Sequence, residues 1–280
     1  MLNPSIFRVL RAATLAVALI SVAHANEGMR LQTASVNAHD LVSLQNGAKL
    51  FVNYCLNCHA ASYMRYNRLS DLGLNEQQIR DNLIFTGVKV GELMKVAMDG
   101  KDAKEWFGVP PPDLTVITRS RSSGAGSGTD WVYTYLKSFY RDDQRPTGWN
   151  NLLFENVGMP HVLWQLSGQQ QLAVQEFKSE HDAHAALIAA KSAARLDAEV
   201  SMNGGKEERR YKLRTLQPGA GTLAPIEYDK QVTDLVNYMG YMAEPMRLER
   251  RQVGTYVLLL LGVLFVFAYA LKKAFWKDVH

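Results

Sequence analysis

Both cysteines of this chain lie in one run of five residues, Cys55-Leu56-Asn57-Cys58-His59. Two thiols separated by two residues and followed by a histidine suit three kinds of chemistry: a redox-active dithiol, half of a zinc site, or covalent attachment of a c-type haem. Each requires different features elsewhere in the chain. The rest of the sequence therefore discriminates between them.

The first two chemistries lack what they need. A thioredoxin-like dithiol expects a βαβ context, and no convincing strand pattern is visible. A zinc ion expects four ligands, but there are no further cysteines, and the close pair His181 and His184 lies in a polar stretch. In the third chemistry each thiol adds to a vinyl group of one haem and the adjacent His59 becomes an iron ligand. We therefore predict one haem c, covalently attached through Cys55 and Cys58.

The N-terminus has the three parts of a secretory signal peptide. Arg8 and Arg11 form a positive region, an apolar run follows at 12–22, and a small-x-small cleavage site lies at 23–25. We expect residues 1–25 to be removed on export. Export agrees with haem attachment, which in bacteria takes place outside the cytoplasm.

The other end of the chain carries an uncharged run, 253–271, which as a helix would span roughly 28 Å and so match the hydrocarbon core of a bilayer. A buried soluble helix would keep a polar stripe, which this run lacks. We predict a transmembrane anchor at 251–272. Basic residues flank both of its ends, so the signal peptide decides the orientation: 26–250 is exported and 273–280 is a cytoplasmic tail.

The formal charge of +4 comes from the signal peptide and from the flanks of the anchor. Without those residues, the exported part has a small excess of acidic over basic side chains. No basic patch remains that would indicate binding to nucleic acid.

Helical periodicity dominates the exported part. Apolar residues recur at helical spacing over 37–54, a capping box begins a second helix at Asn75, and an amphipathic helix contains 232–242. Three consecutive prolines in "GVPPPDL" require an extended loop. The stretch 168–201 is rich in Ala, Gln and Glu, so 165–222 is predicted to be a largely helical insertion. The predicted class is mostly α with long loops.

A haem with one histidine ligand needs a sixth ligand or leaves an open site, and methionine suits electron transfer because it raises the reduction potential. Met159 lies in a Gly-Met-Pro loop that can present its sulfur rigidly, whereas Met64 is too close to the motif to reach the opposite haem face. Spacing alone leaves the choice open. The other methionines after the motif are Met94, Met98, Met202, Met239, Met242 and Met246.

The order of the motifs resembles the cytochrome c1 family, the haem subunits of the cytochrome bc1 complex. The resemblance rests on "NYCLNCHAASYMRYNRL", "WFGVPPPDLTVITRSR", "NVGMP", a helix running into "EP" and one C-terminal anchor. It implies a class I cytochrome c-like haem domain in a bacterial form with a cleavable signal. The insertion at 165–222 departs from the family pattern, and its role does not follow from the resemblance.

The resemblance also implies a role for each motif. Cys55 and Cys58 match the thioether tethers, His59 the proximal ligand and Met159 the distal ligand.

Two further matches concern the surroundings of the haem. Pro111 and Pro112 match the loop whose carbonyl accepts a hydrogen bond from His59 Nδ1. Arg121 matches an arginine near a haem propionate, and Arg119 is its rival.

The implied function is outer-sphere transfer of single electrons. A Rieske iron–sulfur protein would reduce the haem and a soluble or tethered cytochrome c would oxidise it, with cytochrome b and membrane lipid as further partners. The haem domain would lie in the periplasm, on a single-pass anchor in the inner membrane. Quinol oxidation would belong to partner subunits, so the chain is expected to be a redox subunit and not a complete enzyme. The alternatives are a stand-alone anchored carrier, a c-type subunit of a terminal oxidase, and a haem sensor with an open sixth site.

Overall fold

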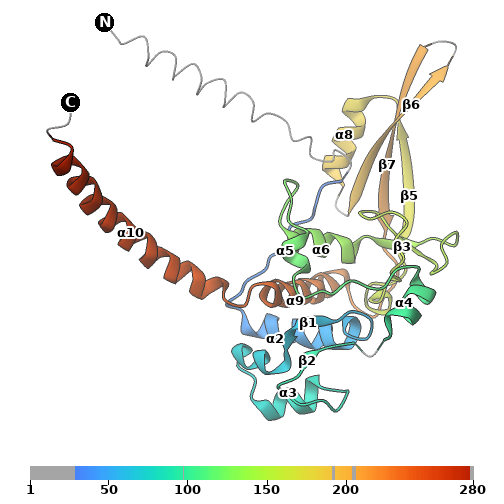
Figure 1. Cartoon of the computed structure of the whole chain (residues 1–280). Helices are drawn as coiled ribbons and strands as arrows, with labels where there is room; N and C mark the ends of the chain where they lie inside the picture. The colour runs from blue at the N-terminus through green and yellow to red at the C-terminus, as the bar shows by residue number, and fades with distance from the viewer. Residues whose placement is uncertain (1–28, 97, 191–192, 204–205, 278–280) are drawn as a thin grey trace, which may run out of the picture. The chain divides into compact units, whose positions relative to one another are not determined.

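The computed structural model describes residues 29–277 apart from 97, 191–192 and 204–205, so the predicted signal peptide at 1–25 and the end of the predicted tail lie outside the described residues. The chain divides into two compact units, whose elements are labelled in Figure 1. The motif unit contains the Cys-x-x-Cys-His run and consists of Ala34–Arg121, Val162–Ser167 and Gly221–His280. The sheet unit consists of Ser122–His161, Gly168–Ala220 and the described residues up to Thr33.

Two helices that are distant in the sequence pack together in the motif unit. Helix α2 spans Leu41–Leu50 and α9 spans Pro225–Ala243, and the two lie side by side (Figure 1). They approach so closely that a Cβ on Gly47 would lie 2.0 Å from the carbonyl oxygen of Asp234. Glycine at this position therefore permits the contact between the two helices.

A buried carboxylate joins the two helices. Asp234, only 3% exposed, accepts hydrogen bonds from Ser43 Oγ (2.7 Å) and Asn46 Nδ2 (2.8 Å) of α2 and from Lys230 Nζ (2.7 Å) of its own helix. A carboxylate buried without such partners would destabilise the fold by roughly several kcal/mol, because it would lose its hydration without compensation. These hydrogen bonds therefore join α2, the helix that precedes the cysteine motif, to α9.

The remaining elements of the motif unit are short. They are a π-helical turn Phe51–Cys55, β1 Ala61–Arg65, a 3-10 helix Tyr66–Leu72, α3 Glu76–Leu83, β2 Leu93–Met94, α4 Gly100–Phe107, α5 Ile117–Ser120 and α7 Trp164–Ser167. The predicted capping box of α3 is confirmed, since Asn75 and Gln78 bond each other's backbone N–H. Strands β1 and β2 pair antiparallel.

Helix α10, Arg247–Phe275, contains the predicted anchor. Its stretch Glu249–Phe275 is long and apolar enough to cross a membrane, and none of its apolar window is buried. The helix therefore fits the transmembrane anchor predicted at 251–272.

The prediction that 165–222 is largely helical is wrong. Strands β5 (Gln171–Phe177), β6 (Ala194–Asn203) and β7 (Lys206–Gln217) form an antiparallel sheet in the order β5-β7-β6. The helical parts of this stretch are α8 (Glu180–Ala189) and the end of α7 (Trp164–Ser167). The fold class therefore contains a substantial β component beside its helices.

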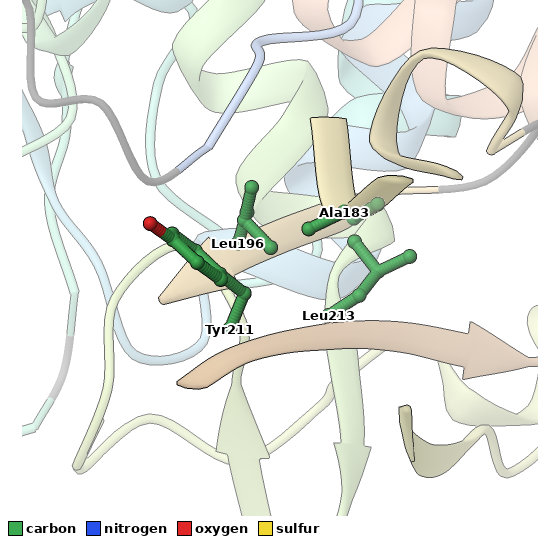
Figure 2. Close-up of a cluster of buried hydrophobic side chains, with 5 residues drawn as sticks. Ala183, Leu196, Tyr211 and Leu213 are labelled. Atoms are coloured by element: carbon green, nitrogen blue, oxygen red, sulfur yellow. The ribbon is translucent and has the colours of Figure 1, made fainter. Parts of the chain in front are cut away.

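The sheet forms because burial in this stretch has a period of two. Tyr211 and Leu213 are buried, whereas Lys212 between them points to the other face and forms ion pairs with acidic neighbours. Figure 2 shows Tyr211 and Leu213 together with Leu196 of β6 and Ala183 of α8 in one cluster. Cross-strand pairing and burial under α8 outweigh the helix preference of the many Ala, Glu and Gln residues.

The rest of the sheet unit consists of α6 (Gly128–Lys137) and a hairpin of β3 (Phe139–Arg141) and β4 (Trp149–Asn151). Tyr140 of β3 packs in one buried cluster with Leu216 of β7. The hairpin and the larger sheet thus share a hydrophobic core.

Candidate functional site

The cysteine motif forms one closed turn at the end of α2. After the π-helical turn, the N–H groups of Cys58 and His59 both donate to the carbonyl oxygen of Cys55, at 3.1 and 2.9 Å. Both thiols and the imidazole therefore come from a single turn of the chain. Such a turn can present two thiols and a metal ligand to one bound group.

The two thiols do not have the character of a redox-active pair. Burial, together with the charge of Cys58, raises the pKa of Cys55 to about 12, and burial also raises the pKa of Cys58. Reactive dithiols instead have a lowered pKa, because the thiolate is the nucleophile. In the part of the chain that the structure describes, no three His, Cys, Asp or Glu side chains are grouped as possible donors to a metal ion.

His59 is oriented by a backbone carbonyl. Its Nδ1 lies 2.7 Å from the oxygen of Pro112, and the side chain is buried. Burial lowers the pKa of His59, while the hydrogen bond to Pro112 and the charge of Asp113 act in the opposite direction. A neutral ring that donates through Nδ1 to a carbonyl keeps its lone pair on Nε2, where it can bind a metal.

Asp113 and its neighbours, which were not predicted, hold the proline loop. The carboxylate of Asp113 accepts hydrogen bonds from the N–H of Ser62 (2.7 Å) and from the N–H and hydroxyl of Thr115 (2.8 and 2.6 Å). Burial acts to raise the pKa of Asp113, but these hydrogen bonds outweigh it and the pKa is lowered. Asp113 is therefore a carboxylate under ordinary conditions.

Met159 lies in the sheet unit. Its sulfur accepts a hydrogen bond from the hydroxyl of Tyr135, with Oη and Sδ 3.4 Å apart, and it packs against a cluster that includes Phe139 and Trp149. The side chain is half-buried. The side chain of Met159 therefore packs against a cluster rich in aromatic rings, and its sulfur accepts a hydrogen bond from a phenol hydroxyl.

Two asparagines organise the loop that carries Met159. Buried Asn151 accepts hydrogen bonds from the N–H groups of Leu153 and Phe154 through Oδ1, both at 3.0 Å. Asn150 Oδ1 accepts from the N–H of Asn156 at 2.9 Å, and Asn156 has a φ of 59°. These side chains replace regular backbone pairing, so the loop has one defined path to Met159.

Most rival methionines have packing roles. Met94, Met239 and Met242 are buried in the motif unit, and Met64 is buried beside the cysteine motif in sequence. The sulfur of Met94 accepts from the hydroxyl of Tyr238 at 3.7 Å. Such positions are those of ordinary core methionines.

Met98, Met202 and Met246 are less buried than these core methionines. Met202 lies on strand β6 and is 73% exposed. Exposure alone gives none of the three a distinct role.

The predicted residues are divided between the two units. Cys55, Cys58, His59, Pro111, Pro112, Arg119 and Arg121 belong to the motif unit, and Met159 belongs to the sheet unit. Within the motif unit the structure joins His59 to Pro112. Arg119 and Arg121 lie at the end of α5 with exposed side chains, and nothing in this geometry favours one over the other.

The chain matches one protein family and several individual proteins. The profile of the Cytochrome C1 family matches residues 32–92 and 221–279, which lie almost entirely in the motif unit. A protein of Allochromatium vinosum named "Cytochrome c1" is 47% identical over 90% of this chain and 91% of its own length.

Two further relatives also span almost the whole chain. A Nitrosomonas europaea protein named "Ammonia monooxygenase gamma subunit" is 42% identical, over 98% of this chain and 100% of its own length. A Rhodospirillum rubrum protein named "Cytochrome c1" is 25% identical, over 97% of both chains. The similarity to these relatives therefore includes the sheet unit as well as the motif unit.

Proposed function

This chain belongs to the cytochrome c1 family, and we propose that it passes single electrons from a Rieske iron–sulfur protein to a cytochrome c. Membership of this family supports a haem electron-transfer subunit of the cytochrome bc1 complex. The apolar helix α10 is long enough to serve as its membrane anchor. The Rieske protein is the proposed electron donor and the cytochrome c the proposed acceptor. Cytochrome b and membrane lipid are proposed as further partners of the chain.

The main support for this function is the closed turn that contains Cys55, Cys58 and His59. In this turn, His59 Nδ1 lies 2.7 Å from the carbonyl oxygen of Pro112. These residues fit a haem c: two free thiols are available for thioether bonds, and the imidazole keeps Nε2 for iron. A single haem is proposed because the chain has two cysteines. When bound, haem supplies a one-electron iron couple.

Met159 is proposed as the distal ligand. The hydrogen bond from Tyr135 supports this, because it holds the sulfur of a half-buried side chain in one orientation. A thioether paired with imidazole gives iron a reduction potential suited to electron transfer. His59 and Met159 would remain bound in both oxidation states, so no proton or substrate has to move at the site.

The surroundings of the haem are proposed from the same motifs. Pro111 and Pro112 would border the haem on the His59 side, and Arg121 or Arg119 would face a propionate. Support comes from α5, which follows the proline loop in the sequence and exposes both arginines.

The membrane arrangement is also a proposal. We propose that 26–250 forms a periplasmic class I cytochrome c-like domain, that 251–272 crosses the inner membrane, and that 273–280 remains in the cytoplasm. The predicted export signal and the apolar helix α10 support this orientation.

Identifying the proteins that accompany the full chain tests this function. Membranes are solubilised in a mild detergent, the chain is purified, and its partners are identified by mass spectrometry. We expect cytochrome b and a Rieske protein in stable proportion to haem. Purification without partners would instead favour a stand-alone carrier, and a haem–copper core would favour a terminal oxidase. Recovery with monooxygenase subunits would favour the role named for the Nitrosomonas relative.

A further inference from the structure

The loop that orients His59 cannot hold itself in place through its own amides. Pro110, Pro111 and Pro112 are consecutive, and proline has no N–H to donate. Yet the carbonyl of Pro112 lies 2.7 Å from His59 Nδ1. The position of this carbonyl must therefore be fixed by other residues.

The residue that follows the prolines provides the fixing contacts. The carboxylate of Asp113 accepts from the N–H of Ser62 at 2.7 Å through one oxygen. Its other oxygen accepts from the N–H and the hydroxyl of Thr115 at 2.8 and 2.6 Å. One side chain thus connects the proline loop to the segment that comes directly after His59.

Two further hydrogen bonds extend this connection. The N–H of Leu114 donates to the carbonyl of Ala60 at 2.9 Å, and the N–H of Tyr63 donates to the hydroxyl oxygen of Thr115 at 3.3 Å. Thr115 is buried, so the hydrogen bonds of its hydroxyl are shielded from water. Both ends of the His59–Pro112 hydrogen bond are consequently held by one network, which we call the Asp113 clamp.

We propose that Asp113 is a positioning residue that, through Thr115 and Ser62, holds the Pro112 carbonyl against His59 and thereby sets the reduction potential of the iron. This inference rests on the proposed function, in which His59 is the iron ligand. A fixed acceptor at Nδ1 makes the imidazole a stronger donor, and a stronger donor stabilises ferric iron. Loosening the clamp should therefore raise the potential.

A charge effect must be separated from a positioning effect, because the charge of Asp113 also acts on His59. Asp113→Asn removes the charge and replaces one acceptor oxygen by a donor. Thr115→Val removes the hydroxyl but leaves the charge in place. Thr115→Ser restores the hydroxyl, and Asp102→Asn removes an exposed carboxylate of α4 as a control.

The experiment uses the full haem-bearing chain in detergent and has two readouts. One is the equilibrium with a reference cytochrome, and the other is the deuterium exchange rate of the His59 Nδ1 proton, followed by NMR. Asp113→Asn and Thr115→Val should each shift the equilibrium toward the reduced protein by about tenfold, which is ~59 mV for one electron. Both should also accelerate proton exchange. Thr115→Ser and Asp102→Asn should stay close to the unaltered protein in both readouts.

Two results would overturn the proposal. The first is a shift in Asp113→Asn alone, with Thr115→Val unchanged in potential and exchange, since Asp113 would then act only as a charge. The second is no shift in either variant. If Asp113→Asn does not retain haem, the comparison of Thr115→Val with Thr115→Ser decides alone. An unaltered chain that lacks covalent haem would instead remove the proposed function itself.

Discussion

The hydroxyl of Tyr135 donates a hydrogen bond to the sulfur of Met159, with the two atoms 3.4 Å apart. The ring of Tyr135 is fixed by its neighbours: it stacks on Trp131 and meets Phe139 edge to face, with centroids 5.1 Å apart in both pairs. Tyr135 can therefore tune the sulfur without taking part in iron binding.

Tyr135→Phe should lower the reduction potential slightly. The substitution keeps the ring and removes the hydroxyl, which withdraws electron density from the sulfur. Without the hydroxyl, the thioether becomes a stronger electron donor and favours ferric iron. The reduction potential should fall by less than about 59 mV, which corresponds to a tenfold shift in the one-electron equilibrium. A redox titration measures this, with Tyr133→Phe of the same helix as the control. A potential that stays the same or rises would contradict the assigned role.

Met159→Leu should remove the sixth iron ligand while the fold survives, because leucine has a similar volume and hydrophobicity. The weak far-red absorption of sulfur bound to ferric iron should disappear, and the reduced protein should bind carbon monoxide. The reduction potential should fall by more than about 120 mV, which corresponds to more than a hundredfold change in the one-electron equilibrium constant. Met242→Leu, at a buried position of α9, should change none of these. If Met159→Leu keeps the band and the potential, the ligand is another residue.

Gly47→Ala should destabilise the motif unit. In an isolated helix this change would be favourable by about 1 kcal/mol. Here the new Cβ would lie 2.0 Å from the backbone oxygen of Asp234, so α2 and α9 would have to separate, which typically costs about 1–3 kcal/mol or more. Denaturant titration should show a net loss, whereas Gly91→Ala, where the Cβ meets nothing within 4 Å, serves as the control. If Gly47→Ala is as stable as the unaltered protein or more stable, the close contact between α2 and α9 is refuted.

Alkaline stability should depend on Tyr238. Burial, followed by the charges of Tyr241 and Tyr66, raises the pKa of Tyr238 above its ordinary value. The unfolded chain therefore loses this proton first, so the contribution is complete below about pH 10 and falls above it by up to about 1.4 kcal/mol per pH unit. Tyr238→Phe keeps the ring contact with Phe51 and should lose less unfolding free energy between pH 9 and pH 11. Parallel losses in the two proteins would contradict this prediction.

Helices α2, α3 and α9 of the motif unit were predictable because their signals are local. Asp40 caps α2, and the apolar stripe containing Val232, Leu235 and Val236 is buried in α9 as its spacing predicts. The capping box at Asn75 was also predicted. In each case the residues that determine the element lie within a few positions of one another.

The sheet and the supports of the site could not be predicted in the same way. Strand β5 pairs with β7, so that Gln171 lies opposite Gln217, and such pairing leaves only a weak alternation in a sequence rich in helix-forming residues. Asp113 likewise gives no local signal of its bond to Ser62, which lies 51 positions earlier. Contacts that are distant in sequence decide both features.

Every redox property proposed above requires that Cys55 and Cys58 hold a haem covalently, and a haem stain of a denaturing gel measures this. Membranes that contain the chain are separated on a denaturing gel and stained for haem peroxidase activity, beside the same chain with Cys55→Ala and Cys58→Ala. We predict a stained band at the mass of the chain, which persists after extraction with acid acetone and is absent from the double variant. A haem that washes out of the unaltered protein, or a stained band that survives the double substitution, would contradict the account.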